Sequence, residues 1–191
     1  MNLDSALWAL GRGTGIVSLL LLTASLVLGV LARSGRPFGP LGRFGVADLH
    51  RTTAMTAVGL VAVHVVSLLF DSYAQLRLID LVVPFLGTYR PFWLGLGTLA
   101  VDLLLVITVV SLLRHRVGPQ VFRGIHLATY ALWPIAFLHS LGTGTDVGTV
   151  AMNAFVVACG LTVLGALAWR GAPSYADRGR TTTRTERKVP A

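Results

Sequence analysis

Five long apolar runs restrict what this chain can fold into more than any other feature of its sequence. A helix needs about 20 predominantly apolar residues to cross the hydrocarbon core of a bilayer. Because lipid offers the backbone no hydrogen-bonding partner, each run is expected to be a helix. The expected spans are residues 6–32, 48–70, 92–113, 124–141 and 148–169. The sequence therefore predicts an all-α integral membrane bundle of about five transmembrane helices.

The composition agrees with a membrane protein, since 54% of the residues are hydrophobic and only 13% are charged. A soluble domain of this length exposes many more charged side chains. The formal net charge of +8 would suit nucleic acid, but the basic residues sit between apolar runs and form no continuous stripe. The expected partner is membrane lipid, with no nucleic acid.

The placement of basic residues predicts an orientation. If the loop after the first span is cytoplasmic, thirteen of the sixteen basic residues lie on that side, and only Arg12, Arg77 and Arg90 lie on the other. The positive-inside rule then puts the amino terminus outside and the carboxyl terminus in the cytoplasm. The expected location is the cell (plasma) membrane, with multiple passes.

Two domains are expected: a membrane domain over residues 1–170, and a disordered, basic cytoplasmic tail over residues 171–191. The amino terminus lacks the basic stretch of a secretory signal, so the first run is expected to remain as a helix. A short apolar stretch, residues 78–86, contains Pro84 and is too short to span, which indicates a re-entrant or interfacial piece. The single cysteine, Cys159, lies in an apolar run and is expected to be a buried hydrophobe.

Four of the five histidines fall into two pairs on two of the expected spans. His50 and His64 are fourteen residues apart, and His126 and His139 are thirteen apart. Both spans run from inside to outside in the predicted orientation, so one histidine of each pair lies at an inner level and the other at an outer level. At 1.5 Å per residue the two levels are separated by about 20 Å. His115 lies in an Arg-His-Arg loop and is expected to be a solvated charge.

Ionisable groups inside a membrane are costly and usually mark function. Two facing histidines supply the two axial nitrogens of one haem iron, so two stacked levels predict two haems along the membrane normal. A single histidine in a membrane helix can simply hydrogen-bond a neighbour, and a proton relay is the main rival for all four. A relay normally recruits acidic partners, and Asp102 is the one carboxylate near mid-membrane. Asp102 is expected to relay protons or to fix a helix contact, and Tyr130 and Trp133 to line a haem face or to pack.

The thirteen-residue spacing conflicts with a regular helix. On a regular helix, two side chains that are fourteen residues apart point within about 40° of the same direction. Two side chains that are thirteen residues apart differ in direction by about 140°. Pro134 lies between His126 and His139, and proline distorts a helix locally. The size of the correction does not follow from the sequence.

The two histidine pairs on two helices of a small bundle resemble the ferric reductase-like transmembrane domain. That domain is shared by ferric reductases, NADPH oxidases and the membrane subunit of a bacterial methionine sulfoxide reductase system. The stretches Tyr-Arg-Pro-Phe-Trp at 89–93 and Gly-Thr-Gly-Thr-Asp at 142–146 are similar to those of members from high-GC Gram-positive bacteria. The resemblance covers roughly residues 6–170, and the paired histidines are its specific part.

The resemblance implies that His50 and His126 ligate an inner haem b, and that His64 and His139 ligate an outer one. Arg51 and Arg123 are candidates to pair with the carboxylates of the inner haem, or else to mark the inner membrane interface. Two departures from the family stand out. Its six-helix members have one more span, and ferric reductases and NADPH oxidases carry a flavin and NADPH module where about twenty tail residues follow here.

The function expected from the sequence is that of a membrane cytochrome b-type oxidoreductase component that conducts electrons between two haems. Its donor is expected to be a separate protein, through a flavin, or membrane quinol, and its acceptor ferric iron, oxygen or an extracytoplasmic redox partner. Two alternatives stay open: a quinol-oxidising anchor for an extracytoplasmic reductase, and a haem or ion transporter without redox turnover.

Overall fold

The computed structural model describes residues 3–72, 74, 76–144 and 146–175. Its elements, in chain order, are α1 (Leu3–Ser34), α2 (Arg43–Leu69), the 3₁₀ helix η1 (Leu78–Leu81), α3 (Pro91–Leu112), α4 (Arg114–Val117), α5 (Pro119–His126), α6 (Thr129–Thr143) and α7 (Val150–Gly171). The described residues form no β-strand and contain one isolated bridge, between Phe38 and Leu41. The all-α prediction is confirmed.

Five helices in the described residues are long and apolar enough to cross a membrane: α1, α2, α3, the α5–α6 pair and α7. Their bounds lie within a few residues of the expected ones, except that α2 and the fourth span each begin five residues earlier than expected. The fourth span is also broken into two helices. Large apolar side chains such as Leu105, Leu161 and Leu164 are more than 60% exposed. Such surfaces suit lipid, so the chain is a multi-pass membrane protein whose helices contact the bilayer.

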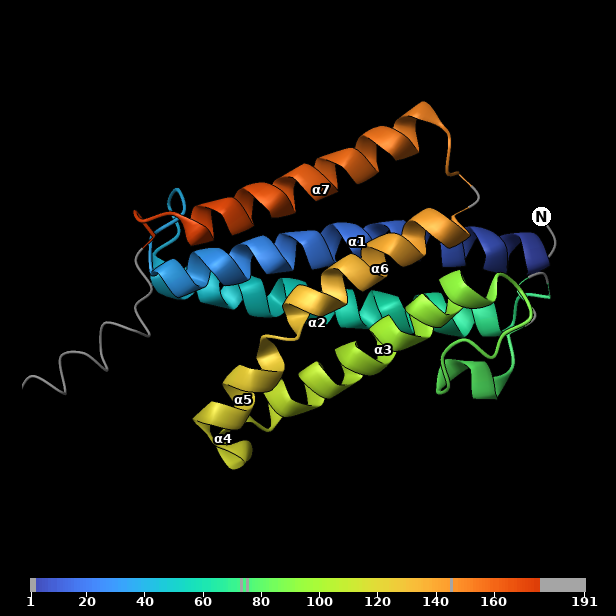
Figure 1. Cartoon of the computed structure of the whole chain (residues 1–191), viewed down its shortest axis with the longest axis horizontal. Helices are drawn as coiled ribbons and strands as arrows, with labels where there is room; N and C mark the ends of the chain where they lie inside the picture. Colours follow the sequence, from blue (N-terminus) through green and yellow to red (C-terminus); the bar gives the residue numbers. More distant parts are fainter. Residues whose placement is uncertain (1–2, 73, 75, 145, 176–191) are drawn as a thin grey trace, which may run out of the picture.

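The helix α1 lies at the centre of the bundle (Figure 1). It packs along α2 for most of its length, while α6 and α7 contact its other sides, and α3 packs against α6. The start of α1, the α2–α3 loop and the α6–α7 loop gather at one end, which we call the outer end after the predicted orientation. The opposite, inner end holds the α1–α2 loop and α4. Which end faces the cytoplasm stays a prediction.

The segment after α7 is described as far as Tyr175, and it packs back on the inner end of α1. The Tyr175 hydroxyl donates to the carbonyl of Val30 (2.9 Å), and the Arg36 guanidinium donates to the carbonyl of Ser174 (3.1 Å). The first residues of the expected tail are therefore held against the bundle. Residues 176–191, for which a disordered tail is expected, lie outside the described residues.

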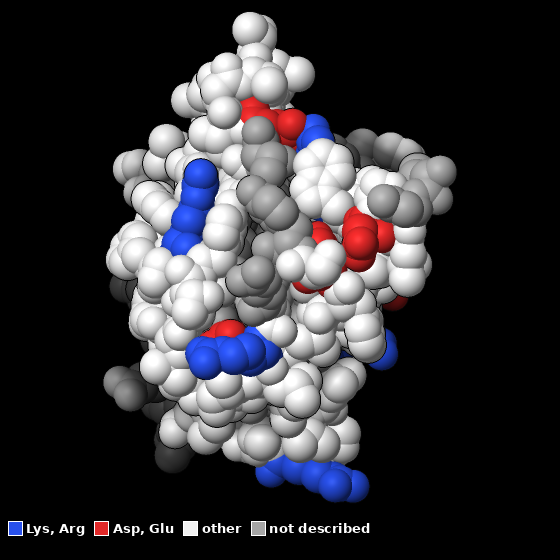
Figure 2. Space-filling view, turned by 90° about the vertical axis from the view of Figure 1, so that its right-hand side faces the viewer, with Lys and Arg blue, Asp and Glu red and all other residues white. Residues whose placement is uncertain are grey.

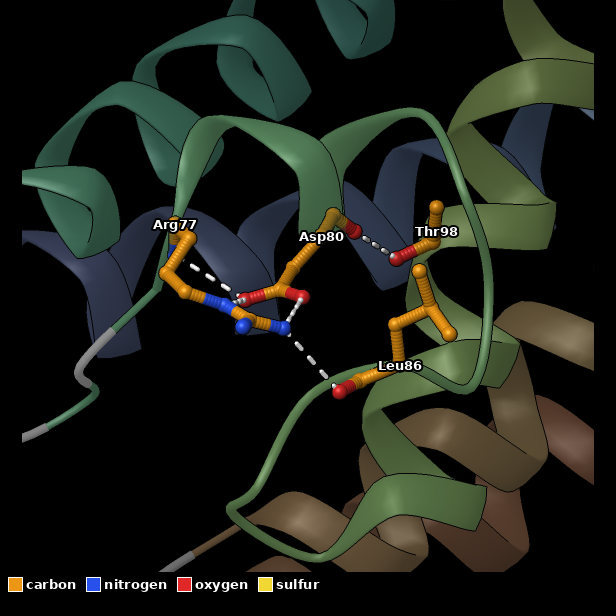
Figure 3. Close-up of polar contacts among 4 residues, drawn as sticks. All are labelled: Arg77, Asp80, Leu86 and Thr98. Atoms are coloured by element: carbon orange, nitrogen blue, oxygen red, sulfur yellow. Dashed lines mark hydrogen bonds and ion pairs between the residues drawn. The ribbon is translucent and has the colours of Figure 1, made fainter.

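The short apolar stretch at 78–86 lies at the outer end, where η1 packs against α3. Asp80 is 3% exposed, and its backbone carbonyl accepts a hydrogen bond from the Thr98 hydroxyl (2.7 Å). The Arg77 guanidinium donates two hydrogen bonds to the Asp80 carboxylate and one to the carbonyl of Leu86, and the Arg77 backbone N–H donates a third to the carboxylate (Figure 3). These donors hold the pKa of Asp80 below its ordinary value, chiefly through the side-chain hydrogen bonds. Asp80 is thus buried, and its backbone carbonyl ties the loop to α3.

Candidate functional site: two histidine pairs between the helices

The four histidines of the expected spans meet inside the bundle as two facing pairs. The ring centres of His50 on α2 and His126 at the end of α5 are 6.1 Å apart, with ring planes at 87°. Those of His64 on α2 and His139 on α6 are 6.5 Å apart, with planes at 84°. We call these the inner pair and the outer pair. The structure therefore brings the predicted residues together in the predicted combinations.

Three of the four rings are fixed by a backbone carbonyl of a neighbouring helix. The Nδ1 atom donates in each case: His50 to Ser25 (2.9 Å), His64 to Gly11 (2.7 Å) and His139 to Trp93 (2.8 Å). A carbonyl can only accept, so Nδ1 carries the proton in these three rings. Their Nε2 atoms keep a free electron pair, which is the arrangement that metal-ligating histidines use.

A glycine stands four residues after each of these carbonyls, and it makes room for the ring. A Cβ added at Gly15 would lie 3.0 Å from the His64 ring, and one at Gly29 would lie 3.3 Å from the His50 ring. At Gly97 it would lie 2.5 Å from the His139 ring. We call this combination, a carbonyl and a glycine four residues later on the neighbouring helix, a histidine notch.

The notches were only partly predictable. Glycines at 15 and 97 suggest close helix contact, but the sequence does not say with what. The spacing is the stronger signal for the notches, because Gly15 and Gly29 are fourteen residues apart, as are His50 and His64. Because α1 and α2 run antiparallel, equal spacing places one glycine opposite each histidine.

His126 lacks such a notch. Its Nδ1 atom is buried and has no hydrogen-bond partner among the described residues. None of the glycines within the described helices has the His126 ring among the atoms nearest to an added Cβ. The ring instead stacks on Phe122 of its own helix, with centres 5.2 Å apart and planes at 25°.

A break in the fourth span reduces the mismatch that the thirteen-residue spacing creates. The helix α5 ends at His126 and α6 begins at Thr129, where the structure departs from the single helix expected. Around the break the backbone N–H groups of Ala128, Tyr130 and Ala131 donate to the carbonyls three residues earlier. Such 3₁₀ bonding turns the chain by about 120° per residue instead of 100°. The extra rotation moves His139 toward the side on which His126 lies.

Pro134 lies inside α6, five residues after Thr129, the first residue of that helix. It has no N–H to donate to the carbonyl of Tyr130, and its ring crowds the preceding turn. The break itself lies at Leu127 and Ala128, before the helical turn that precedes the proline.

A largely apolar cavity of about 250 Å³ adjoins the outer pair. Its lining includes His64, His139 and the notch glycines Gly15 and Gly97. Toward the outer end the lining becomes polar and includes Arg12 and Asp146, which form an ion pair between α1 and the α6–α7 loop. On this end of the molecule acidic and basic side chains are mixed on a mostly uncharged surface (Figure 2).

The other candidates lie away from the ring contacts. Arg51 and Arg123 are exposed and form no hydrogen bond or ion pair with the described residues, so their expected role toward a haem stays a prediction. Trp133 is buried, donates to the Thr23 hydroxyl (2.9 Å) and stacks on Phe137, which is a packing role. Asp102 also has no polar partner among the described residues. His115 is exposed, as expected.

The fold and the site define a class: a multi-pass helical membrane protein with two histidine pairs stacked between its helices. The sequence matches the family described as "Ferric reductase like transmembrane component" over residues 14–137, and the chain belongs to that family. The match includes His50, His64 and His126 and ends two residues before His139. No curated protein and no solved structure matches the chain. Membership in this family points to a membrane electron-transfer component.

The residues present fit a haem at each level. No cluster of three or more metal-binding side chains occurs in the described part of the chain, so each level offers two imidazoles. Two side-chain ligands suit a metal whose other positions a macrocycle fills. Metal–imidazole bonds are about 2 Å, and the ring centre lies about 1 Å beyond the nitrogen, so two rings flanking one metal have centres roughly 6 Å apart. The observed distances of 6.1 and 6.5 Å agree with that value.

Proposed function

We propose that this chain is a membrane cytochrome b-type subunit that holds two haems between histidine pairs and conducts electrons across the bilayer. His50 and His126 would ligate the inner haem, and His64 and His139 the outer one. Bound haem supplies one-electron redox chemistry at a potential that its axial ligands help to set. The donor lies outside the five spans, and a redox partner or a small oxidant would accept the electrons.

One observation carries the proposal: two facing histidine pairs with the ring separation that a shared metal requires, at two levels of one bundle. Three of the four rings have Nδ1 committed to a carbonyl, which leaves Nε2 as the coordinating atom. A proton relay would instead need Nδ1 free to exchange its proton along a chain of polar groups.

The protein contributes position and exclusion of water. The notch carbonyls fix the ring orientation, and the notch glycines allow the rings to lie against α1 and α3. The walls of the outer cavity are mostly apolar side chains from α1, α2, α3 and α6. These walls would shield a bound macrocycle from water over much of its surface, which would limit side reactions of the reduced iron.

The test is the reduced-minus-oxidised absorption spectrum of the purified protein in detergent, with haem quantified per chain. Two low-spin b-type haems are expected, with one lost in His64→Ala and the other in His126→Ala. His115→Ala is the matched control, since that histidine is exposed outside both pairs, and it should retain both haems. A wild-type protein that binds no haem under conditions that retain it in related proteins would overturn the proposal and favour proton or ion handling.

A further inference from the structure

His126 is held differently from the other three histidines of the site. Their Nδ1–H groups donate to carbonyls, whereas Nδ1 of His126 is buried and unpaired among the described residues. The rings of those three histidines lie against the notch glycines. The ring of His126 instead stacks on the ring of Phe122. The two levels of the site are therefore built unequally.

The missing hydrogen bond weakens His126 as a ligand. A carbonyl that accepts from Nδ1–H fixes the orientation of an imidazole and raises the basicity of its Nε2 atom. Outer-shell partners of this kind typically contribute about 10–100-fold to metal affinity. His126 therefore lacks both the fixed ring orientation and the raised basicity. His50, opposite it, donates to the carbonyl of Ser25 at 2.9 Å.

The backbone that carries His126 is also held less firmly. The helix α5 has eight residues, ends at His126 and is followed by the break before α6. Its main neighbours are α3 and the four-residue α4, whereas the long helix α2 packs along α1. His50, His64 and His139 all lie inside longer helices. A small movement of α5 can therefore displace this ring without disturbing the other three.

We propose that His126 is the exchangeable ligand of the site, so that the inner level alone admits a small neutral molecule such as carbon monoxide. The inference rests on the proposed function, since it requires a haem at each level. In the exchange the bond between the iron and Nε2 of His126 breaks, and a bond to the carbon atom of carbon monoxide forms. The released imidazole keeps its electron pair, and no electron is transferred.

The test is a carbon monoxide difference spectrum of the dithionite-reduced protein, with bound carbon monoxide counted per haem. One of the two haems should bind it in the wild type. The double variant His64→Ala/His139→Ala removes both outer ligands, and its remaining haem should bind carbon monoxide fully. The reverse variant, His50→Ala/His126→Ala, should keep one haem that binds none. Double variants remove both ligands of one level, so the carbon monoxide that is bound can be assigned to the haem at the other level.

The amount of carbon monoxide bound per haem in the wild-type protein tests the inference even if a double variant fails to fold. Binding to neither haem, or to both, would overturn the inference, as would binding that survives in the variant without inner ligands. These outcomes differ from failure of the proposed function, in which the purified protein would contain no haem. A protein with two haems that both resist carbon monoxide leaves the proposed function intact and removes only the special role of His126.

Discussion

The ring of His64 lies against α1 where Gly15 has no side chain. A Cβ at Gly15 would stand 3.0 Å from both Cε1 and Nδ1 of the ring, and that Nδ1 donates to the carbonyl of Gly11 one turn earlier. A helical carbonyl already accepts from the N–H four residues later, so the histidine uses its second lone pair. The glycine thus leaves the carbonyl accessible to a side chain from another helix.

We expect alanine at the notch glycines to release haem in a graded order. The added methyl group meets the ring at 2.5 Å at Gly97, 3.0 Å at Gly15 and 3.3 Å at Gly29, so Gly97→Ala should be the most damaging and Gly29→Ala the mildest. Gly13→Ala is the control, because a Cβ there meets nothing within 4 Å. It should be neutral or stabilise α1 by up to about 1 kcal/mol. Haem content per chain and melting temperature are the measurements, and equal effects at Gly13 and Gly15 would contradict the notch.

Ser111 offers the converse test. It lies fourteen residues after Gly97, as Gly29 does after Gly15, and Ile107 correspondingly follows Trp93. The buried cluster of Ala100, Ile107 and Leu132 packs against Ile125 and Ala128, on either side of His126. This part of α3 therefore lies near His126, but Ser111 carries a side chain at the position where a notch would need glycine. Ser111→Gly should give His126 access to the Ile107 carbonyl and reduce carbon monoxide binding at the inner level. Unchanged carbon monoxide binding in a variant with full haem content would mean that Ser111 does not obstruct a notch.

The sequence alone was sufficient to predict the membrane-spanning helices and the pairing of the histidines. Apolar runs of membrane length define the spans, and two histidines on each of two helices of the same direction define two levels. It could not predict the break after His126, because proline indicates a distortion but not where its rotation is absorbed. Nor could it predict the notches, since these depend on which backbone carbonyls of α1 and α3 remain accessible after packing. The clearest sequence signal for them is the shared fourteen-residue spacing of glycines and histidines.

The hydrogen bond from Trp133 to Thr23 should contribute measurably to stability. It joins α6 to α1 at 2.9 Å in a buried site, and Trp133 also packs near Cys159 and Val163 of α7. Trp133→Phe should lower the free energy of unfolding by about 1–2 kcal/mol, through the lost hydrogen bond and some lost packing. In a double-mutant cycle with Thr23→Val, measured by unfolding in mixed detergent, the two changes should be less than additive. Full additivity would show that the two side chains act independently.

The outer loop should loosen in acid. Arg77 holds the pKa of Asp80 below its ordinary value, so the ionised carboxylate stabilises the loop at neutral pH. A depressed pKa gives stability that is present above the unfolded value of about 4 and is lost as the pH falls through the lower folded value. Proteolysis or hydrogen exchange of residues 77–86 should therefore increase below about pH 4. Asp80→Asn should show the open loop already at neutral pH, and a wild-type loop that stays protected in acid would argue against this clamp.

Asp102 should be dispensable for the bundle, and its replacement by leucine should stabilise the protein. Helical spacing puts it on the same stripe of α3 as Leu105 and Val109, which are 62% and 44% exposed, and it has no polar partner among the described residues. A polar group in an apolar environment without a hydrogen bond costs about 1–3 kcal/mol, so Asp102→Leu should raise the free energy of unfolding by a similar amount. Haem content should be unchanged, because the stripe does not line the outer cavity. Loss of stability or of haem in Asp102→Leu would instead show that this carboxyl group fixes a contact or relays protons, the two roles that its mid-membrane position suggests.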